Sequence, residues 1–189
     1  YYRVRDNNFS ISGLLGFDMH GKTAGLVGTG KIGQCAGRIL AGFGMKILAY
    51  DRHQDEAFVK ATGTEYCDLD RLYRESDIIT LHCPLTPETH HMINAESIEK
   101  MKKGVMLINS SRGSLIDTAA LIEGLKSGKV GSAGLDVYEE ESDYFFEDKS
   151  DAVIKDDILA RLLSFNNVIV TSHQAFFTGE ALTIIASTS

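Results

Sequence analysis

The sequence has few cysteines, and none of them are closely paired. Its 189 residues contain three, Cys35, Cys67 and Cys83, an odd number with no CxxC motif. A disulfide framework or a thiolate metal site needs a more regular set, so the simplest interpretation is three free thiols. Free thiols persist in a reducing compartment, and the sequence therefore predicts a cytoplasmic protein.

Long hydrophobic runs and basic blocks are also absent from the sequence. No apolar run approaches the ~20 residues needed to cross a bilayer, which argues against a membrane partner. The 19 Lys and Arg are outnumbered by 26 Asp and Glu and form no block, which argues against a nucleic-acid partner. With 43% hydrophobic residues, the chain is nevertheless long enough to bury a full core.

Apolar runs and helical patterns alternate along the chain. The runs predict strands at 23–28, 45–50, 77–81, 104–109, 131–137 and 167–170. Helical patterns lie between them, at 32–41, 55–61, 69–74, 95–101, 118–127 and 156–163. Strands separated by helices pair in parallel through right-handed crossovers. We therefore predict an α/β fold with a doubly wound parallel sheet, and ligands beyond the carboxyl ends of its strands.

The most informative motif is Gly28-x-Gly30-x-x-Gly33, which directly follows the first predicted strand. Gly28 allows a tight turn, Gly30 lets a pyrophosphate approach the backbone, and Gly33 permits close helix–strand packing. A helix beginning near Lys31 then presents unpaired N–H groups and the positive end of its dipole to the anion. The alternative is a merely glycine-rich turn, which does not explain why strand, glycines and helix are in register.

An acid follows the second predicted strand at the position where a dinucleotide site needs one. Asp51 comes 23 residues after Gly28, close to the offset of about 20 at which a carboxylate receives the hydroxyls of the adenosine ribose. The same carboxylate repels a 2′-phosphate, although the neighbouring Arg52 offsets part of that repulsion. The pattern therefore predicts NAD rather than NADP.

Polar groups that a core does not need follow three of the later strands. They are Arg112, the acidic run Glu139, Glu140 and Glu141, and His173. Because parallel strands end at one edge of a sheet, these groups can converge on one cleft. Such a set suits carbonyl reduction: the guanidinium binds a substrate carboxylate, the imidazolium gives a proton as hydride arrives, and the carboxylate favours the charged ring.

Each of these groups also has a simpler interpretation. Arg112 could pair with a carboxylate or a cofactor phosphate, the acidic run could be a solvated loop, and His173 could be a hydrogen-bonded strand-end residue. The acids match no EF-hand spacing and have no nearby His, so no metal site is predicted. The remaining histidines are interpreted as surface or loop residues: His20, His53, His82, His90 and His91.

These motifs resemble those of the D-isomer-specific 2-hydroxyacid dehydrogenases, and within that family the chain is similar to the fermentative D-lactate dehydrogenases. The resemblance covers about residues 4–189 and is carried by segments 25–33, 81–87, 109–113, 134–139 and 173–176. Segment 145–150 is more discriminating, because many phosphoglycerate and glycerate relatives have a Pro-containing loop there.

The resemblance implies an NAD-dependent oxidoreductase that interconverts a 2-oxo acid and a 2-hydroxy acid, pyruvate and D-lactate first among them. Arg112 would bind the substrate, Glu141 would orient and charge the histidine, His173 would be the acid–base, and Phe176 would wall the pocket. The alternatives are another 2-oxo acid, or a non-catalytic NADH-sensing protein of the corepressor type. The absence of an interaction tail favours the enzyme.

The resemblance also implies a set of cofactor contacts. Asp51 would hold the ribose, and Arg112 is counted among the contacts. Lys31 and Ile32 would approach the diphosphate, and Cys83 and Pro84 would line the adenine side. Ser110 and Ser111 would line the nicotinamide side, and Asp136 would contact the carboxamide.

Finally, the resemblance implies a second α/β domain and a homodimer. Residues 1–10 would be the end of a linker helix from that domain, residues 11–180 the dinucleotide-binding domain, and residues 181–189 the start of a return helix. The chain begins at Tyr1 rather than Met and stops just after the apolar segment 181–186, so we expect it to be a piece of a longer polypeptide.

Overall fold

A parallel sheet forms the centre of the protein in a computed structural model that describes residues 2–141, 144–146, 148–151 and 153–188. The sheet has seven strands in the order β3-β2-β1-β4-β5-β6-β7, and all neighbours pair in parallel. The strands are β1 (Thr23–Val27), β2 (Lys46–Tyr50), β3 (Glu65–Tyr66), β4 (Ile78–Leu81), β5 (Val105–Asn109), β6 (Val130–Leu135) and β7 (Val168–Val170). The strand order reverses between β1 and β4, which is where ligands of doubly wound sheets bind.

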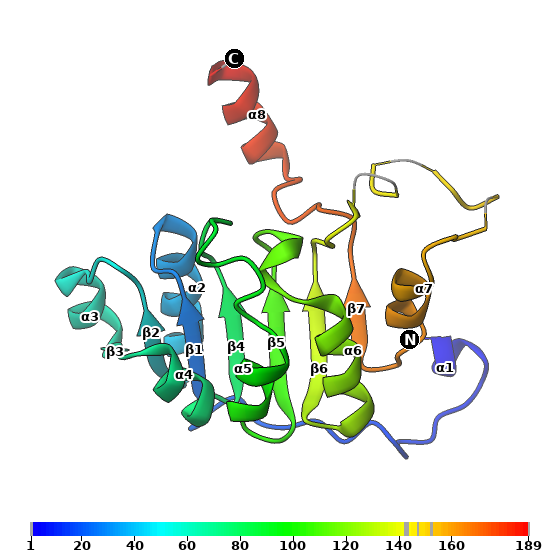
Figure 1. The fold of residues 1–189 in the computed structure, drawn as a ribbon, viewed down its shortest axis with the longest axis horizontal. Coiled ribbons are helices and arrows are strands. Elements are labelled where there is room, and N and C mark those ends of the chain that lie inside the picture. The colour runs from blue at the N-terminus through cyan, green and yellow to red at the C-terminus, as the bar shows by residue number, and fades with distance from the viewer. Residues whose placement is uncertain (1, 142–143, 147, 152, 189) are drawn as a thin grey trace.

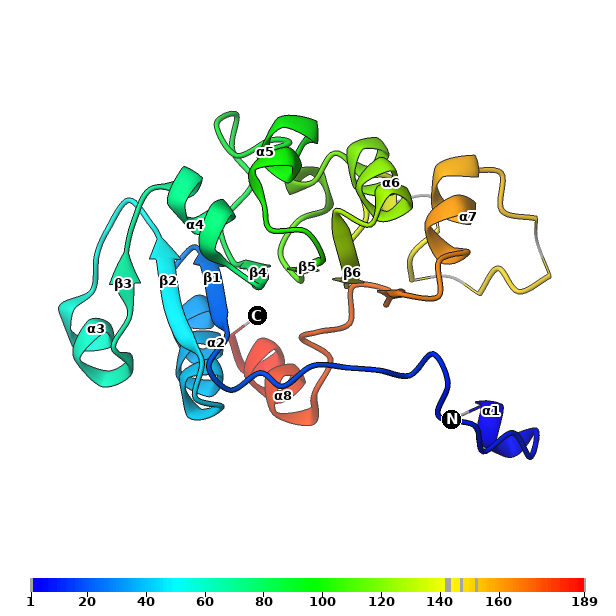
Figure 2. The same ribbon diagram turned by 90° about the horizontal axis from the view of Figure 1, so that it is seen from below.

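Helices cover both faces of the sheet, as the alternating pattern predicts. The α-helices of the described chain are α1 (Tyr2–Arg5), α2 (Lys31–Gly42), α3 (Glu56–Thr62), α4 (Leu69–Glu75), α5 (Ala95–Lys100), α6 (Thr118–Ser127), α7 (Asp157–Leu163) and α8 (Gly179–Thr188). Helices α4, α5 and α6 lie on one face and α2 on the other (Figures 1 and 2). The doubly wound α/β prediction is therefore confirmed.

Local sequence explains where the helices begin and end. Side chains of Asn94 and Asp117 accept backbone N–H groups at the starts of α5 and α6. Gly128 ends α6 in the left-handed conformation at φ 71°, and Gly44 follows α2 at φ 75°. Each of the six helices predicted between strands is present, with bounds within one residue of the prediction.

Two apolar clusters hold the helices to the sheet. The larger one packs α4–α6 against the sheet and includes Leu72, Leu107 and Leu121. The smaller one lies under α2 and includes Leu26 and Ile47. These five side chains are at most 1% exposed, so the glycine turn and the strand ends stand on a closely packed base.

Two features differ from the prediction. Strand β3 is missing from it, because Glu65–Tyr66 is only two residues long and lies at the sheet edge. The fifth predicted strand, 131–137, is wrong at its carboxyl end, since β6 ends at Leu135. The chain turns at Asp136 because that carboxylate binds backbone N–H groups of the loop after β7.

The ends of the chain leave the sheet on opposite sides. Residues 6–22 run along the amino ends of the strands to β1, whereas α8 projects beyond the carboxyl ends (Figures 1 and 2). None of the described α8 residues is buried. Within the described residues, no helix combines the length and apolar character needed to cross a bilayer.

Some predicted segments are described only in part. Tyr1, Ser142, Asp143, Glu147, Ala152 and Ser189 lie outside the described residues. The predicted segments 1–10 and 181–189 and the discriminating segment 145–150 each contain one or more of them.

Candidate active site

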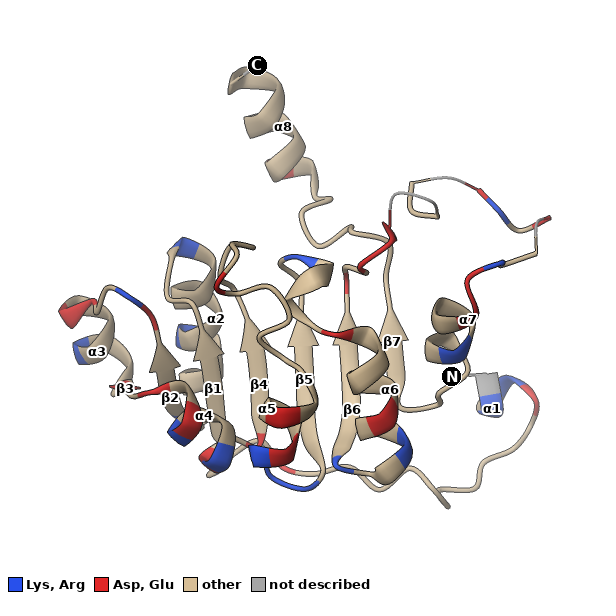
Figure 3. Cartoon of the chain, viewed as in Figure 1, with Lys and Arg blue, Asp and Glu red and all other residues tan. Residues whose placement is uncertain are grey.

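The residues predicted for the cofactor and for catalysis lie at or just beyond the carboxyl ends of the strands. Strands β1, β4, β5, β6 and β7 contain no charged residue. Charged side chains therefore gather on the helices and on the loops beyond the strand ends (Figure 3). This is the edge of the sheet at which α8 projects.

The glycine turn after β1 is crowded at two glycines and open at the third. Gly28 has φ 97°, and a Cβ there would lie 2.7 Å from the Cys83 nitrogen, so a side chain is excluded both sterically and conformationally. A Cβ on Gly33 would collide with the Gly28 carbonyl oxygen. Around Gly30, no atom of the described chain other than its own and those of its chain neighbours lies within 4 Å of the Cβ position, which leaves room for a ligand.

Helix α2 begins directly behind that open space. Gly30 is its N-cap and provides no side-chain hydrogen bond, so the first N–H groups of the 12-residue helix remain available to an anion. Lys31 and Ile32 are the first two residues of the helix, and both are exposed. The turn therefore has the space and the donors that a diphosphate requires.

A cavity of about 270 Å³ adjoins the glycine turn between β1, β2 and the loop after β4. Five of the predicted cofactor residues line it: Gly28, Gly30, Asp51, Cys83 and Pro84. The other lining residues, none of which is among the predicted cofactor contacts, are Val27, Tyr50, Arg52, His53, His82, Thr86, Thr89 and Met92. Most of the wall is apolar, with Asp51 as its carboxylate, which suits an adenosine group.

Asp51 is fixed by its neighbours at the rim of this cavity. One carboxylate oxygen accepts from the Thr29 nitrogen at 2.6 Å and hydroxyl at 3.1 Å, and the other accepts from the His53 nitrogen at 3.0 Å. Burial raises the pKa of the Asp51 carboxyl, but the hydrogen bonds from His53 and Thr29 outweigh it, so the pKa lies below its ordinary value. Asp51 is therefore ionised at neutral pH.

An Asp51→Ala substitution should weaken NADH binding by about tenfold or more. It should also reduce the ratio of the Kd for NADPH to the Kd for NADH. The lost contacts are charge-assisted hydrogen bonds, and the lost charge no longer repels a 2′-phosphate. Fluorescence titration of both reduced cofactors measures the effect, with the exposed neighbour Glu56→Gln as a matched control. Equal or tighter binding of NADPH by the unsubstituted protein would contradict the assignment.

His173 lies just beyond β7 with a carboxylate at its ring. Its Nδ1 is 3.0 Å from Glu141 Oε1, and both side chains are about one-quarter exposed, at 27% and 25%. The His173 N–H donates to the Asp136 carbonyl at 2.7 Å, and its φ of 51° is unusual for a residue other than glycine. Nδ1 is hydrogen-bonded to Glu141, whereas Nε2 forms no hydrogen bond with any described residue. Nε2 can therefore face a substrate.

The three consecutive acids have three different environments. Glu141 faces His173, whereas Glu139 binds the ring of His91 and the first residue of α6, Thr118. Glu140 is exposed. The geometry thus brings one of the three carboxylates to His173, and it is the one that the resemblance implies.

Arg112 lies in the turn after β5 with its guanidinium exposed. Nη1 donates to the Ser111 carbonyl at 2.7 Å, and Ser111 Oγ donates to the Cys83 carbonyl at 2.6 Å. Among the described residues, Arg112 forms no hydrogen bond or ion pair with Glu141 or His173. Its remaining N–H groups can therefore receive a carboxylate, and its substrate role stays a prediction.

Asp136 supports the loop that carries His173. Its carboxylate accepts from Thr171 Oγ1 at 2.5 Å, from the Gln174 nitrogen at 2.9 Å and from the Ala175 nitrogen at 2.8 Å. Burial raises the pKa of the Asp136 carboxyl, but these hydrogen bonds outweigh it and lower the pKa. The predicted contacts of Asp136 with the carboxamide and of Ser110 and Ser111 with the nicotinamide side stay predictions. Phe176 is 46% exposed at the end of the same loop.

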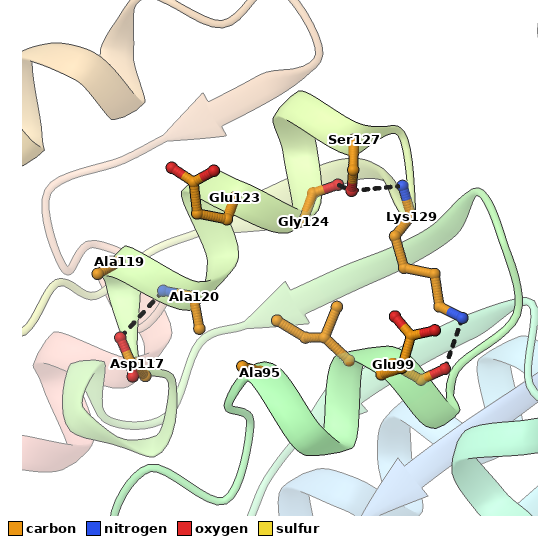
Figure 4. Close-up of a pocket in the computed structure, with 10 residues that line it drawn as sticks. Ala95, Glu99, Asp117, Ala119, Ala120, Glu123, Gly124, Ser127 and Lys129 are labelled. Atoms are coloured by element: carbon orange, nitrogen blue, oxygen red, sulfur yellow. Dashed lines mark hydrogen bonds between the residues drawn. The ribbon is translucent and has the colours of Figure 1, made fainter.

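A second cavity, of about 550 Å³, lies in the groove between α5 and α6 (Figure 4). Its polar groups are engaged locally: Asp117 accepts from the Ala120 nitrogen, Ser127 donates to the Gly124 carbonyl, and Lys129 donates to the Glu99 carbonyl. None of the predicted cofactor or catalytic residues lines this groove. No group of three or more possible metal ligands occurs within the described residues.

A doubly wound sheet, a glycine turn at its switch point and an ionised acid at the adenosine cavity define the class of a dinucleotide-binding domain. The sequence profile of the D-isomer specific 2-hydroxyacid dehydrogenase NAD-binding domain matches residues 1–175, and the chain belongs to this family. The open space at Gly30, the exposed start of α2 and the cavity at Asp51 all fit NAD, which is the cofactor of this domain.

Three relatives show how far the likeness extends. The D-lactate dehydrogenase of Escherichia coli K12 is 57% identical over 189 residues, which cover 100% of this chain and 57% of that protein. A solved structure described as the pyruvate reductase of Chlamydomonas reinhardtii has a TM-score of 0.95 and 52% identity, covering 100% of this chain and 57% of that one. The D-lactate dehydrogenase of Aquifex aeolicus, solved with NAD and lactic acid, has a TM-score of 0.89 and 40% identity, covering 99% and 57%. The chain therefore spans a little over half the length of these relatives.

Proposed function

We propose that this chain is the nucleotide-binding part of an NAD-dependent D-lactate dehydrogenase that reduces pyruvate and oxidises D-lactate. The observation that carries the proposal is the His173–Glu141 pair, placed beyond the strand ends of a domain whose glycine turn and Asp51 fit NAD. The names of the relatives from Escherichia coli and Aquifex aeolicus support lactate, and that of the Chlamydomonas reinhardtii structure supports pyruvate.

Each of the three predicted catalytic side chains has a defined task in this mechanism. Reduced nicotinamide supplies hydride to the substrate carbonyl when it is bound. Arg112 holds the carboxylate of the 2-oxo acid and polarises its carbonyl, while His173 donates a proton from Nε2 to the carbonyl oxygen. Glu141 keeps the proton on Nδ1 and stabilises the charged ring. Oxidation runs through the same groups in reverse.

A panel of 2-oxo acids assayed with NADH on the full-length protein tests the proposal. We expect pyruvate to have the highest kcat/KM, ahead of branched and aromatic 2-oxo acids. A preference for a bulkier acid would keep the reaction class and change the substrate. NADH binding without turnover of any 2-oxo acid would instead indicate an NADH sensor and contradict the enzyme.

Glu141→Gln should shift the pH dependence of pyruvate reduction. Protonated His173 drives the reaction in this direction, so kcat/KM falls as pH rises and the ring loses its proton. Without the carboxylate the imidazolium is less stable, and the fall should begin at a lower pH. The measurement is the pH profile of kcat/KM for the full-length enzyme, with Glu140→Gln as the control of equal charge change. An unchanged profile in Glu141→Gln would remove this carboxylate from the mechanism.

We also propose that the complete protein contains a second α/β domain and forms a homodimer in the cytoplasm. Apolar side chains of the N-terminal segment are half to fully exposed here, namely Phe9, Ile11, Leu14, Leu15 and Phe17. Exposed apolar side chains of this kind are typical of a surface that another domain or subunit covers. The free thiols are typical of a protein in a reducing compartment. Light scattering on the full-length protein tests the dimer, which a monomeric mass would rule out.

A further inference from the structure

Glu139 forms a second histidine–carboxylate pair two residues before Glu141. Its Oε1 lies 2.6 Å from His91 Nε2, and its Oε2 accepts from the Thr118 nitrogen at 2.8 Å and from the Thr118 hydroxyl. The Glu139 side chain is 21% exposed, and Thr118 is buried. The carboxylate therefore joins the loop after β6 to the loop after β4 and to the start of α6.

The two partners of Glu139 are themselves held in place. His91 has φ 51°, its N–H donates to the Ser114 carbonyl at 2.8 Å, and its carbonyl accepts from Asn94 Nδ2 at 2.9 Å. Its ring also stacks on that of His90 with 3.9 Å between centroids. Thr118 is the first residue of α6, where the helix dipole favours an anion. Glu139 is thus bound to two fixed points.

The turn that contains Glu139 also places Glu141. The Tyr138 N–H donates to Glu141 Oε2 at 3.2 Å, which leaves Oε1 toward His173. The Tyr138 ring is buried, and its hydroxyl donates to Asp156 at 2.6 Å. On the other side, Gly113 lies so close that a Cβ there would collide with the Tyr138 carbonyl, so the Arg112 turn abuts the same backbone.

We propose that Glu139 is a positioning residue for proton transfer. By binding His91 and Thr118 it fixes the turn 138–141, and the fixed turn holds Glu141 within hydrogen-bonding distance of His173. The inference rests on the proposed function, because it concerns the residue that places the partner of the catalytic histidine. It assigns to Glu139 an effect on the reaction that is exerted through Glu141 alone.

A double-mutant cycle in the full-length enzyme tests this coupling. Glu139→Ala should lower kcat for pyruvate reduction by about tenfold to 10²-fold, because a small misplacement of a catalytic group has effects of that size. Its pH profile should shift in the same direction as that of Glu141→Gln, while the Kd for NADH stays unchanged. In a Glu141→Gln background, Glu139→Ala should cause little further loss of kcat.

Two further variants separate positioning from damage to the fold. Glu139→Gln keeps an acceptor for Thr118 and a polar group for His91, so it should restore most of kcat. His91→Asn suits the φ of that position but does not reach Glu139, and it should give a smaller loss with the same pH shift. Together they test the proposal even where Glu139→Ala does not fold.

The outcomes distinguish the inference from the proposed function. The positioning role would be overturned if the kcat loss of the Glu139→Ala/Glu141→Gln double variant equalled the product of the two single losses. It would also be overturned if the pH profile were unshifted in both Glu139→Ala and His91→Asn. In that event Glu141→Gln still shifts the profile, and the proposed function stands. A Glu141→Gln enzyme with an unaltered profile would instead overturn the proposed relay, and the inference with it. The exposed neighbour Glu140→Ala is the matched control.

Discussion

Replacing His173 with asparagine should lower kcat/KM for pyruvate by about 10²- to 10⁴-fold, the range that a general acid contributes. Asparagine tolerates the backbone conformation of this position, φ 51°, and keeps the N–H that donates to the Asp136 carbonyl. Its amide can still face Glu141 but cannot deliver a proton to a carbonyl oxygen. The substitution therefore removes the chemistry while keeping the loop.

The Kd for NADH should stay close to that of the unsubstituted enzyme, because the adenosine cavity and the glycine turn do not include His173. His20→Asn is a matched control, since His20 is exposed and packs on Gly44, away from the strand ends that carry the site. Steady-state kinetics of the full-length enzyme provide the measurement. A His173→Asn enzyme with normal kcat/KM would show that another group donates the proton.

Features that depend on neighbouring residues were the ones that the sequence predicted well. The glycine turn, the start of α2 and Asp51 all lie within one strand–helix–strand unit, so their spacing alone determines how they meet. Helix ends followed from Asn94, Asp117 and Gly128, whose effects on the backbone are local. Strand β3 was missed because two residues at a sheet edge form no apolar run.

Features that depend on distant residues were harder to predict. His173 and Glu141 are 32 positions apart, and no periodicity chooses among three adjacent glutamates, so the choice of Glu141 came from the family resemblance. His91 and Glu139 are 48 positions apart on two loops. Their pairing depends on how the turn 138–141 packs against α6. His91 is a loop residue, as predicted, but its contact with Glu139 had no signal in the sequence.

Residues 1–189 alone should bind NADH and yet reduce pyruvate at least about 10²-fold more slowly than the full-length protein. The glycine turn, Asp51 and the adenosine cavity all belong to one continuous fold, so cofactor affinity should largely survive. Titration of NADH fluorescence with both proteins measures this part. A large loss of affinity in the shorter chain would mean that the longer protein completes the cofactor site.

Turnover should be lost because the substrate side of the site is open to water. Arg112 is exposed, Phe176 is 46% exposed, and none of the described α8 residues is buried. Carbonyl reduction needs a closed, water-poor cleft that holds the substrate near the hydride, and loss of positioning alone costs on the order of 10²-fold in rate. Pyruvate-dependent oxidation of NADH by both proteins checks the prediction. Equal rates would place the whole substrate site within these 189 residues and contradict the proposal of a second domain that closes it.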